Sequence, residues 1–191
     1  KNIGKLVNLK YIDISFNNLK ALPSSFSKLT NLETIIAENN MIKALPSNFG
    51  SLKKLKKLNL RKNKIVELPK DFPELTALED LNLRENRIIE IPAEIIKLEN
   101  LVHLDLTGNK IVEVPNVSKL TKLEVLKLTD NRIVEFPKNV SKLLNLKELY
   151  LNDNRIIVLS DKISELSNLE KLEMEYNKIT DIHPVIFEQT K

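Results

Sequence analysis

The sequence predicts a solenoid of the α/β class, in which one short structural unit is stacked eight times. An apolar frame recurs along the whole chain, and each unit contains one asparagine within that frame. Successive asparagines are 23 residues apart, or 22 in one case: Asn17, Asn40, Asn63, Asn86, Asn109, Asn131, Asn154 and Asn177. Self-similarity with a fixed period of roughly 20 to 50 residues indicates a repeat architecture. We therefore expect a solenoid in which short parallel strands form a sheet and short helices or 3₁₀ turns complete each unit.

The repeats divide the chain into regular units within a single domain, residues 1–191. Residues 1–8 match the second half of a repeat, and no initiating methionine precedes them, so we expect a fragment of a longer protein. The complete repeats are 9–31, 32–54, 55–77, 78–100, 101–122, 123–145, 146–168 and 169–191.

Each repeat should begin with a strand, because apolar and polar residues alternate there, as in Leu58-Asn59-Leu60. Period-two alternation places the leucines inward and the polar residues outward. The asparagine follows at the turn, where its amide can pair with backbone groups that the bend leaves without partners. Stacked repeats should therefore form an asparagine ladder.

A proline then occupies the return segment of most repeats, where its fixed φ and missing N–H are tolerated. The six prolines are Pro23, Pro46, Pro69, Pro92, Pro115 and Pro137. Ser160 and His183 replace it in the last two repeats, so we expect the array to change character near its C-terminus. The segment after the proline, such as 92–100, should form a short helix or 3₁₀ turn.

The frame LxxLxLxxNxIxxLPxxIxxLxx, which fits the chain from Leu9 to Lys191, resembles the leucine-rich repeat family. Its 23-residue spacing and its proline are similar to the intracellular group that includes Ras-pathway scaffolds and related plant and microbial proteins. The short repeat, 101–122, resembles a 22-residue subclass found in phosphatase-regulating relatives. The resemblance implies a curved horseshoe with the parallel β-sheet on its concave face and short helices or 3₁₀ turns on its convex face. It also implies a module that binds proteins, with small GTPases and protein phosphatases as plausible partner classes.

The composition favours a cytoplasmic protein, since cysteine is absent and the disulfide-bonded caps of secreted relatives have no counterpart here. Two N-x-S sequons, at Asn116 and Asn139, fall at nearly the same repeat position and are interpreted as products of the frame. The formal net charge of +4 is too small to imply a polyanionic partner by itself. No stretch is long and apolar enough to predict a membrane span, and we expect no membrane partner.

The outward positions of the strands and of the turns after them should form the binding surface, because they vary while the frame does not. All three tyrosines fall there, and tyrosine is enriched in binding hot spots. The candidate partner-binding residues are Tyr11, Phe16, Lys57, Arg61, Arg84, His103, Asp105, Lys127, Tyr150, Asp153 and Tyr176. A basic run from Lys53 to Lys57 and glutamates near the C-terminus should give this surface opposite charges at its two ends, which could orient a partner.

Three further columns follow the asparagines. A basic column, from Lys64 to Lys178, and an acidic column, from Glu67 to Asp181, are expected to form cross-repeat ion pairs. Between them runs an apolar column that could mark a homodimer interface or could simply suit an extended backbone: Val66, Ile89, Val112, Val134 and Ile157.

Catalysis, metal binding and cofactor binding find little support in the sequence. His103 and Asp105 should share a strand face, but no nucleophile is obviously placed beside them. No pair of histidines or cysteines has metal-ligand spacing, and no Gly-rich phosphate loop is present. Nucleic-acid binding is disfavoured because the basic run lacks aromatic residues that could stack on bases and because acidic residues share its face.

We therefore expect a non-catalytic protein-interaction module that binds a protein partner on its concave face, as part of a signalling scaffold. Two alternatives stay open: the targeting or regulatory region of a larger kinase, phosphatase or cyclase, and a surface recognition protein.

Overall fold

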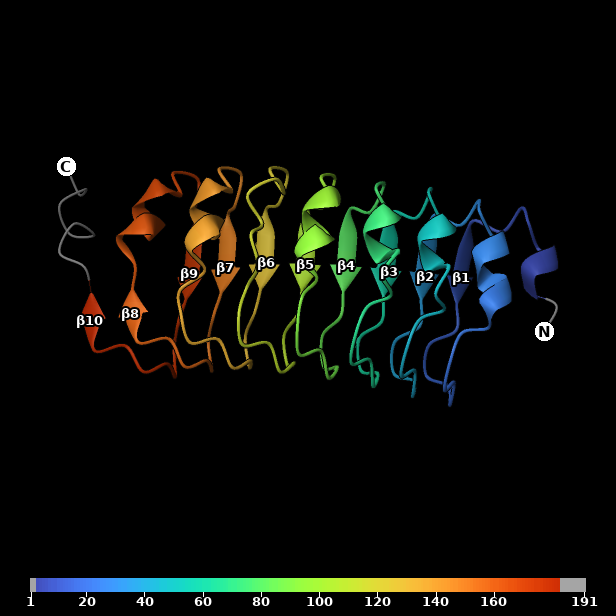
Figure 1. Ribbon diagram of the computed structural model, residues 1–191, viewed down its shortest axis with the longest axis horizontal. Helices are drawn as coiled ribbons and strands as arrows, with labels where there is room; N and C mark the ends of the chain where they lie inside the picture. The colour runs from blue at the N-terminus through green and yellow to red at the C-terminus, as the bar shows by residue number, and fades with distance from the viewer. Residues whose placement is uncertain (1–2, 183–191) are drawn as a thin grey trace.

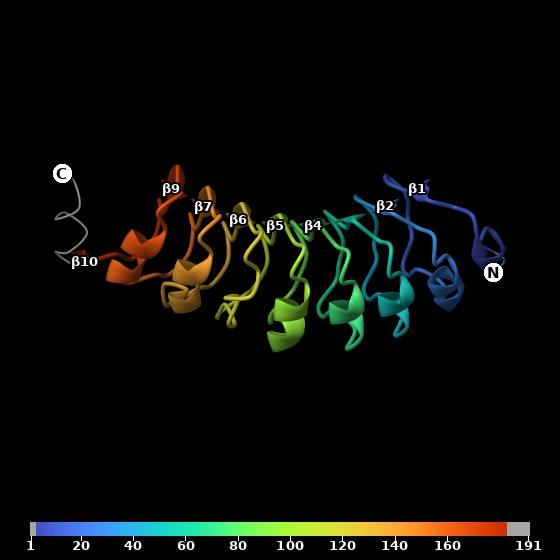
Figure 2. The same cartoon turned by 90° about the horizontal axis from the view of Figure 1, so that it is seen from above.

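The computed structural model describes residues 3–182, which form an elongated, gently curved array of stacked coils (Figures 1 and 2). Eight parallel strands lie side by side in the order β1-β2-β3-β4-β5-β6-β7-β9, and each pairs in register with the same positions of the next repeat. The strands line the inside of the arc, as predicted. Their bounds are β1 Tyr11–Asp13, β2 Thr34–Ile36, β3 Lys57–Asn59, β4 Asp80–Asn82, β5 His103–Asp105, β6 Val125–Lys127, β7 Glu148–Tyr150 and β9 Lys171–Glu173.

The outside of the arc carries 3₁₀ helices, which confirms the predicted convex face (Figure 2). Their bounds are η1 Ile3–Lys5, η2 Ser24–Lys28, η3 Phe49–Ser51, η4 Phe72–Glu74, η5 Ala93–Lys97, η6 Lys138–Lys142 and η7 Asp161–Glu165. Pro23, Pro92 and Pro137 stand at the N-caps of η2, η5 and η6 with φ between −60° and −68°, the value that the proline ring imposes. Between β5 and β6 only turns are present, so the loss of one residue from repeat 101–122 removes the helix.

The C-terminal repeats differ from the others, as the loss of the proline predicts. Ser160 caps η7 through its hydroxyl, which accepts a hydrogen bond from the Lys162 N–H at 3.2 Å. Just before it, β8 (Val158–Leu159) pairs in parallel with β10 (Asp181–Ile182) in a second small sheet. Repeats 7 and 8 are therefore joined by two strand pairings, β7 with β9 and β8 with β10. His183, the other departure from proline, lies outside the described residues.

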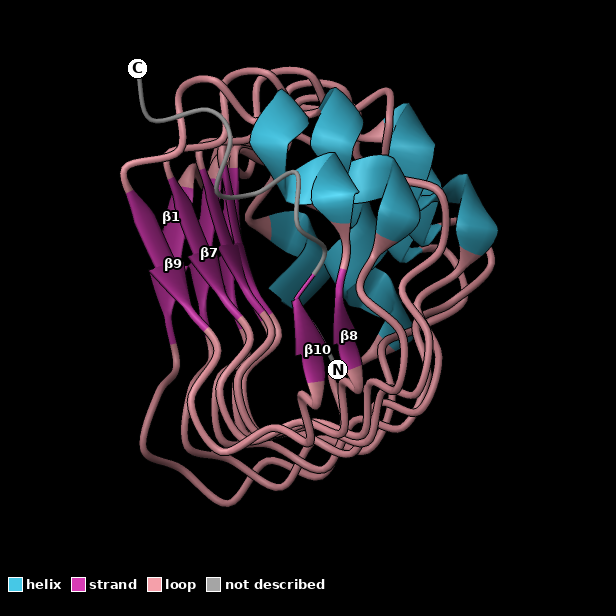
Figure 3. Cartoon of the chain, turned by 90° about the vertical axis from the view of Figure 1, so that its left-hand side faces the viewer, coloured by secondary structure: helices cyan, strands magenta, loops and turns pink. Residues whose placement is uncertain are grey.

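Figure 3 shows the sheet on one side of the coils and the 3₁₀ helices on the other, and the buried side chains of the core come from the residues between and within them. The frame residues supply it: Leu58, Leu81 and Leu104 of neighbouring strands are at most 3% exposed. Each repeat contributes side chains that the next repeat covers, so burial is continuous from Leu22 to Leu166. Stability in such an array resides largely in the contacts between neighbouring repeats.

The asparagine ladder is present. The Asn63 amide donates to the carbonyls of Leu60 and Arg61 in its own repeat and of Ala37 in the previous one, at 3.0–3.2 Å. Its Oδ1 accepts the N–H of Ile42 at 3.0 Å. The pattern recurs at Asn40, Asn86, Asn109, Asn131, Asn154 and Asn177. Each of these side chains thus fastens two repeats together.

The residue before each asparagine adopts a left-handed conformation from repeat 1 to repeat 8. Its φ lies between +53° and +68°, and only Gly108 is a glycine there. The other positions are occupied by Phe16, Asn39, Lys62, Glu85, Asp130, Asp153 and Tyr176. Asparagine and aspartate tolerate this conformation, but other non-glycine residues carry a steric cost of about 1–2 kcal/mol, so the turn that presents the ladder is strained at Phe16, Lys62, Glu85 and Tyr176.

A second ladder of asparagines was not predicted from the sequence. It lies just before the strands, where Asn31, Asn100, Asn145 and Asn168 donate to a carbonyl 24 residues earlier. Lysines occupy the same position in two other repeats, where Lys54 donates to Asn31 and Lys122 donates to Asn100. This ladder connects adjacent repeats on the side of the sheet opposite the first one.

Candidate functional site

The concave sheet places the outward residues of eight strands in parallel columns. The register sets Lys57 beside Asp80, Asp80 beside His103, and His103 beside Val125. Because adjacent strands are about 4.8 Å apart, the seven intervals from β1 to β9 span about 34 Å. The predicted partner-binding residues all lie in β1, β3, β5, β6 and β7 or in the turns that follow the strands.

Two aromatic side chains stand in the left-handed turns at opposite ends of the sheet. Phe16 follows β1 with 70% of its surface exposed, and Tyr176 follows β9 with 78% exposed. Both have positive φ. Tyr11 on β1 is also exposed. A large, exposed aromatic ring at a position that glycine would fill without strain gains little from packing.

The centre of the sheet carries a basic cluster around one carboxylate. Arg61, Lys62 and Arg84 all contact Glu85, at 3.2, 3.6 and 2.9 Å. Partial burial would raise the pKa of Glu85, but the hydrogen bonds from Arg84 and Arg61 outweigh it and lower that pKa. Three cations around one anion leave a net positive charge. This cluster can accept a carboxylate or another acidic group from a partner.

Tyr150 on β7 is the centre of a second polar cluster. The ammonium groups of Lys127 and Lys171 lie 5.1 and 4.9 Å from its ring centroid, within cation–π range. Its hydroxyl donates to Glu148 at 2.6 Å, and this bond is the main reason that the pKa of Tyr150 is raised. The ring is therefore held in place before any partner arrives.

Lys171 completes this cluster by pairing with Glu173 at 2.8 Å. The hydrogen bond to Glu173 raises the pKa of Lys171, and the same bond together with one from Asn152 lowers the pKa of Glu173. Sequence reasoning missed Lys171. Its signal is its repeat position, which is the one that Lys57, Asp80 and His103 occupy in their strands.

Some outward side chains form hydrogen bonds with the backbone of the following turn and are therefore less available to a partner. The side-chain oxygens of Asn59, Asn82 and Asp105 accept the backbone N–H two residues later, at 2.9–3.0 Å. Asp13 accepts hydrogen bonds from the hydroxyl and the backbone N–H of Ser15, and these two bonds lower the pKa of Asp13. The Asp105 carboxylate is thus occupied by Thr107, while His103 stands exposed on the strand beside it.

The basic run from Lys53 to Lys57 is partly neutralised. Lys53 pairs with Glu74 at 3.2 Å, and Lys57 pairs with Asp80 at 2.8 Å. Lys54 donates to Asn31. The expected positive patch is therefore weaker on the concave sheet than the sequence suggests, and the Arg61–Arg84 cluster carries most of it.

The flank that follows the carboxyl ends of the strands, at the lower edge of Figure 1, carries the three other columns. The predicted cross-repeat ion pairs between the basic and acidic columns are wrong for Glu67, Glu90, Glu113 and Asp181: none of these carboxylates lies within 4 Å of a basic-column side chain among residues 3–182. The apolar column between them is exposed by 40–55% at each position. The repeats stack in register, so the residues of one column lie side by side, and the apolar column separates the basic column from the acidic one.

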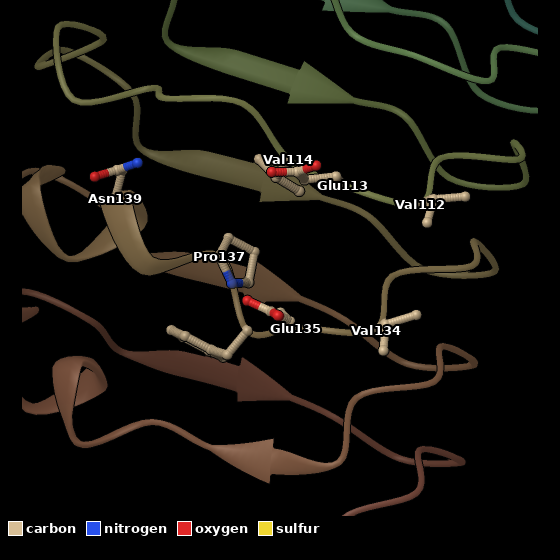
Figure 4. Close-up of a pocket in the computed structure, with 8 residues that line it drawn as sticks. Val112, Glu113, Val114, Val134, Glu135, Pro137 and Asn139 are labelled. Carbon is tan, nitrogen blue, oxygen red and sulfur yellow. The ribbon is translucent and has the colours of Figure 1, made fainter.

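Two hollows open on this flank. The first, of about 320 Å³, lies between the segments 112–114 and 134–137 (Figure 4). The second, of about 480 Å³, lies between 134–136 and 157–161. Figure 4 shows Val112 and Val134 on neighbouring segments, with Glu113 and Glu135 farther along each segment.

Residues 3–182 contain no group of three or more histidine, cysteine or acidic side chains arranged to hold a metal ion. Within the same residues, no helix has the length and apolar character required to span a bilayer.

The chain matches family descriptions along its whole length. The description "Leucine-rich repeat region" matches residues 1–85 and 48–129, and "Leucine rich repeat" matches residues 121–179 and 144–191. A comparison with curated protein sequences gives no significant match.

Several solved structures are similar. A leucine-rich repeat protein of Leptospira interrogans is 34% identical over 96% of this chain and 47% of its own, with a TM-score of 0.92. The internalin InlF of Listeria monocytogenes is 25% identical over 95% of this chain and 52% of its own, with a TM-score of 0.83. The plant peptide hormone receptor RGFR1, solved in complex with RGF2, is 26% identical over 99% of this chain and 36% of its own, with a TM-score of 0.75. The chain thus spans about half the length of the first two proteins, or less in the case of the receptor.

Proposed function

The chain belongs to the leucine-rich repeat family, and we propose that it is a non-catalytic module that binds a protein or peptide on its concave sheet. The observation that carries this proposal is the pair of exposed aromatic rings, Phe16 and Tyr176, in left-handed turns at the two ends of the sheet. Each ring exposes apolar surface in a strained conformation, and burial against a partner would offset both costs.

The dimensions of the sheet suit a polypeptide. An extended chain advances about 3.3 Å per residue, so about 34 Å of sheet accommodates roughly ten residues or the face of a small domain. Its polar clusters indicate the chemistry of the partner. An acidic group should lie over Arg61 and Arg84, and an apolar or aromatic group should lie near Tyr176. RGFR1, which has the same fold, is itself a peptide hormone receptor.

We further propose a cytoplasmic signalling scaffold, with a small GTPase or protein phosphatase as the partner class. The absence of cysteine and the 23-residue frame with its proline support this assignment. Surface recognition is the second candidate, favoured by the similarity to the Leptospira protein and to the Listeria internalin. Identification of the partner decides between the two.

The test is affinity capture with the chain from a lysate and, separately, from a surface-protein fraction of its source, with the retained proteins identified by mass spectrometry. A variant with Arg84→Glu, Tyr150→Ala and Tyr176→Ala should lose the partner. The matched control, Glu94→Lys on the convex helix η5, changes an exposed charge away from the sheet and should retain it. Equal capture by both variants would refute the concave site.

A further inference from the structure

The exposed apolar column on the flank is confined to the middle of the array. Val66, Ile89, Val112, Val134 and Ile157 stand on five successive repeats, each 40–55% exposed. The same position holds Lys20 and Lys43 in the first two repeats and Thr180 in the last. The column therefore begins at repeat 3 and ends at repeat 7. We call it the apolar stripe.

A row of charge accompanies the stripe on each side. The basic row, Lys64, Arg87, Lys110 and Arg132, precedes it by two residues in each repeat. The acidic row, Glu67, Glu90, Glu113 and Glu135, follows it by one residue. Among residues 3–182, Lys64, Arg87 and Lys110 form no ion pair with Glu67, Glu90 or Glu113. Four consecutive repeats thus present the order basic, apolar, acidic across the flank.

We propose that this flank is an interface between two copies of the chain, related by a two-fold axis parallel to the length of the solenoid. Under such an axis, each repeat of one copy lies opposite the same repeat of the other copy. The basic side of one stripe then lies opposite the acidic side of the other. The stripe of one copy then meets the stripe of the other, and each basic row meets an acidic row. For example, Lys110 of one copy faces Glu113 of the second copy. The surface is its own complement in this arrangement.

The antiparallel arrangement is disfavoured by the same pattern. A two-fold axis perpendicular to the solenoid would keep each row on its own side and would bring basic row against basic row and acidic row against acidic row. Like charges directly opposed across an interface are unfavourable, and they suppress wrong pairings more than attraction strengthens right ones. The order of the rows therefore selects the parallel dimer.

The hollows on the flank add contact area to this arrangement. They lie beyond the stripe on its acidic side, so the basic side chains of the second copy pass over them. The long aliphatic stem of Arg132 of the second copy can cover apolar surface at Val134 and Val114 while its guanidinium stays near the acidic row. Arginine is well suited to this dual role because its stem is apolar and its head is charged.

The curvature of the array sets the extent of the contact. The chain follows a shallow arc (Figure 2), and the arc of the second copy bends the opposite way. The two stripes therefore coincide near Val112, in the middle, and diverge toward the ends. The two concave sheets face away from each other and stay open, so the dimer would present two binding faces.

The stripe is about 19 Å long, since it spans four intervals of about 4.8 Å, and about 13 Å wide across four extended residues. This footprint, about 250 Å² on each copy, is smaller than the roughly 800 Å² per partner of a standard interface. The dimer is therefore expected to be weak and reversible, to form only at high protein concentration, and to weaken further with salt as its charge rows are screened.

The first test is sedimentation equilibrium over a range of concentrations with charge-swapped variants. One variant, Arg87→Glu with Lys110→Glu, makes both rows acidic at the centre; the other, Glu90→Lys with Glu113→Lys, makes both basic. Each alone should stay monomeric, whereas an equimolar mixture should form a heterodimer at least as tight as the parent dimer. Circular dichroism of each variant verifies that it is folded. Monomers in every sample, the parent included, would overturn the proposal.

The second test determines the orientation. Because the chain has no cysteine, Ile89→Cys introduces a single thiol. The parallel axis brings residue 89 of the two copies together, so oxidation should yield a disulfide-linked dimer. The antiparallel arrangement would instead place residue 89 opposite residue 134. Lys43→Cys, at the same repeat position but outside the stripe, is the matched control and should crosslink much less. Equal crosslinking of the two variants, or crosslinking only when Ile89→Cys is mixed with Val134→Cys, would contradict the parallel dimer.

Discussion

Replacement of Asn86 by alanine should destabilise the array much more than the same replacement of Asn17. The Asn86 side chain makes four hydrogen bonds: Oδ1 accepts the Ile65 N–H at 3.0 Å, and Nδ2 donates to the carbonyls of Leu60, Leu83 and Arg84 at 2.9–3.3 Å. The carbonyls of Leu60 and Leu83 keep a second donor, from Asn63 and Asn109. The Ile65 N–H has no other partner among the described residues and belongs to a fully buried residue.

The expected magnitude follows from these contacts. An unsatisfied buried amide N–H costs about 1–3 kcal/mol, and the lost hydrogen bonds to the carbonyls add a smaller cost to this. We expect a loss of about 3 kcal/mol for Asn86→Ala. Asn17 is exposed and donates only to Ile14 and Ser15, so Asn17→Ala should cost about 1 kcal/mol or less.

The assay is equilibrium unfolding in urea, followed by circular dichroism. For an m-value of about 3 kcal/mol per molar, the difference of about 2 kcal/mol moves the midpoint of Asn86→Ala about 0.7 M below that of Asn17→Ala. Asn86→Asp is an isosteric check, because it keeps the acceptor for Ile65 but turns a carboxylate oxygen toward the Leu60 and Leu83 carbonyls. It should be at least as destabilising as alanine at neutral pH. Equal midpoints for Asn17→Ala and Asn86→Ala would refute the role assigned to the ladder.

Three further predictions concern single positions. Gly50→Ala should be strongly destabilising, by about 3 kcal/mol or more, because the added Cβ would lie 2.0 Å from the Asp71 carbonyl oxygen. Gly108→Asn should be nearly neutral, because a Cβ has room there and seven other repeats hold a larger residue in this turn. Thermal unfolding of both variants measures the contrast, and equal losses would contradict it. In a Tyr11→Phe, Tyr176→Phe background, Tyr150 should titrate above pH 10.0, because its hydroxyl donates to Glu148, and Glu148→Gln should lower that pKa. Tyrosinate absorbance follows the titration, and an unchanged pKa in Glu148→Gln would exclude the assigned cause. Hydrogen bonds from Lys162 and Lys142 lower the pKa of Glu165 to about 2, so its stabilisation is complete above about pH 4.5 and is lost as the pH falls toward 2. Glu165→Gln should therefore lose less stability than the parent between these pH values. Acid-unfolding curves of the same shape for the variant and the parent would show that the hydrogen bonds from Lys142 and Lys162 to Glu165 contribute no stability.

The sequence predicted the fold well because the frame residues act alike in every repeat. Leu58 and Asn63 point inward wherever the unit is stacked, so period and residue type determine the strand, the turn and the ladder. The second ladder escaped notice because its position is shared with Lys54 and Lys122, which interrupt the run of asparagines. A comparison of the residues at the same position of each repeat, whatever their type, would have revealed the second ladder.

The candidate site was harder to predict because it depends on side-chain pairing. The sequence placed Lys57, Arg61 and Tyr150 on one face but did not show that Asp80, Glu85 and Glu148 contact them. It also suggested that the charge rows of the flank would pair with each other. Glu67, Glu90 and Glu113 do not, because the apolar stripe lies between them and the basic row.

The central claim is that the concave sheet binds a protein partner. Once a partner has been captured, isothermal titration calorimetry of that purified protein with the parent chain, the concave variant and the convex control tests the claim most directly. Loss of one hot-spot residue typically costs about 2 kcal/mol or more, so the variant with Arg84→Glu, Tyr150→Ala and Tyr176→Ala should bind at least about 30-fold more weakly. Glu94→Lys should bind as the parent does. Unchanged affinity of the concave variant would show that the partner binds elsewhere on the molecule.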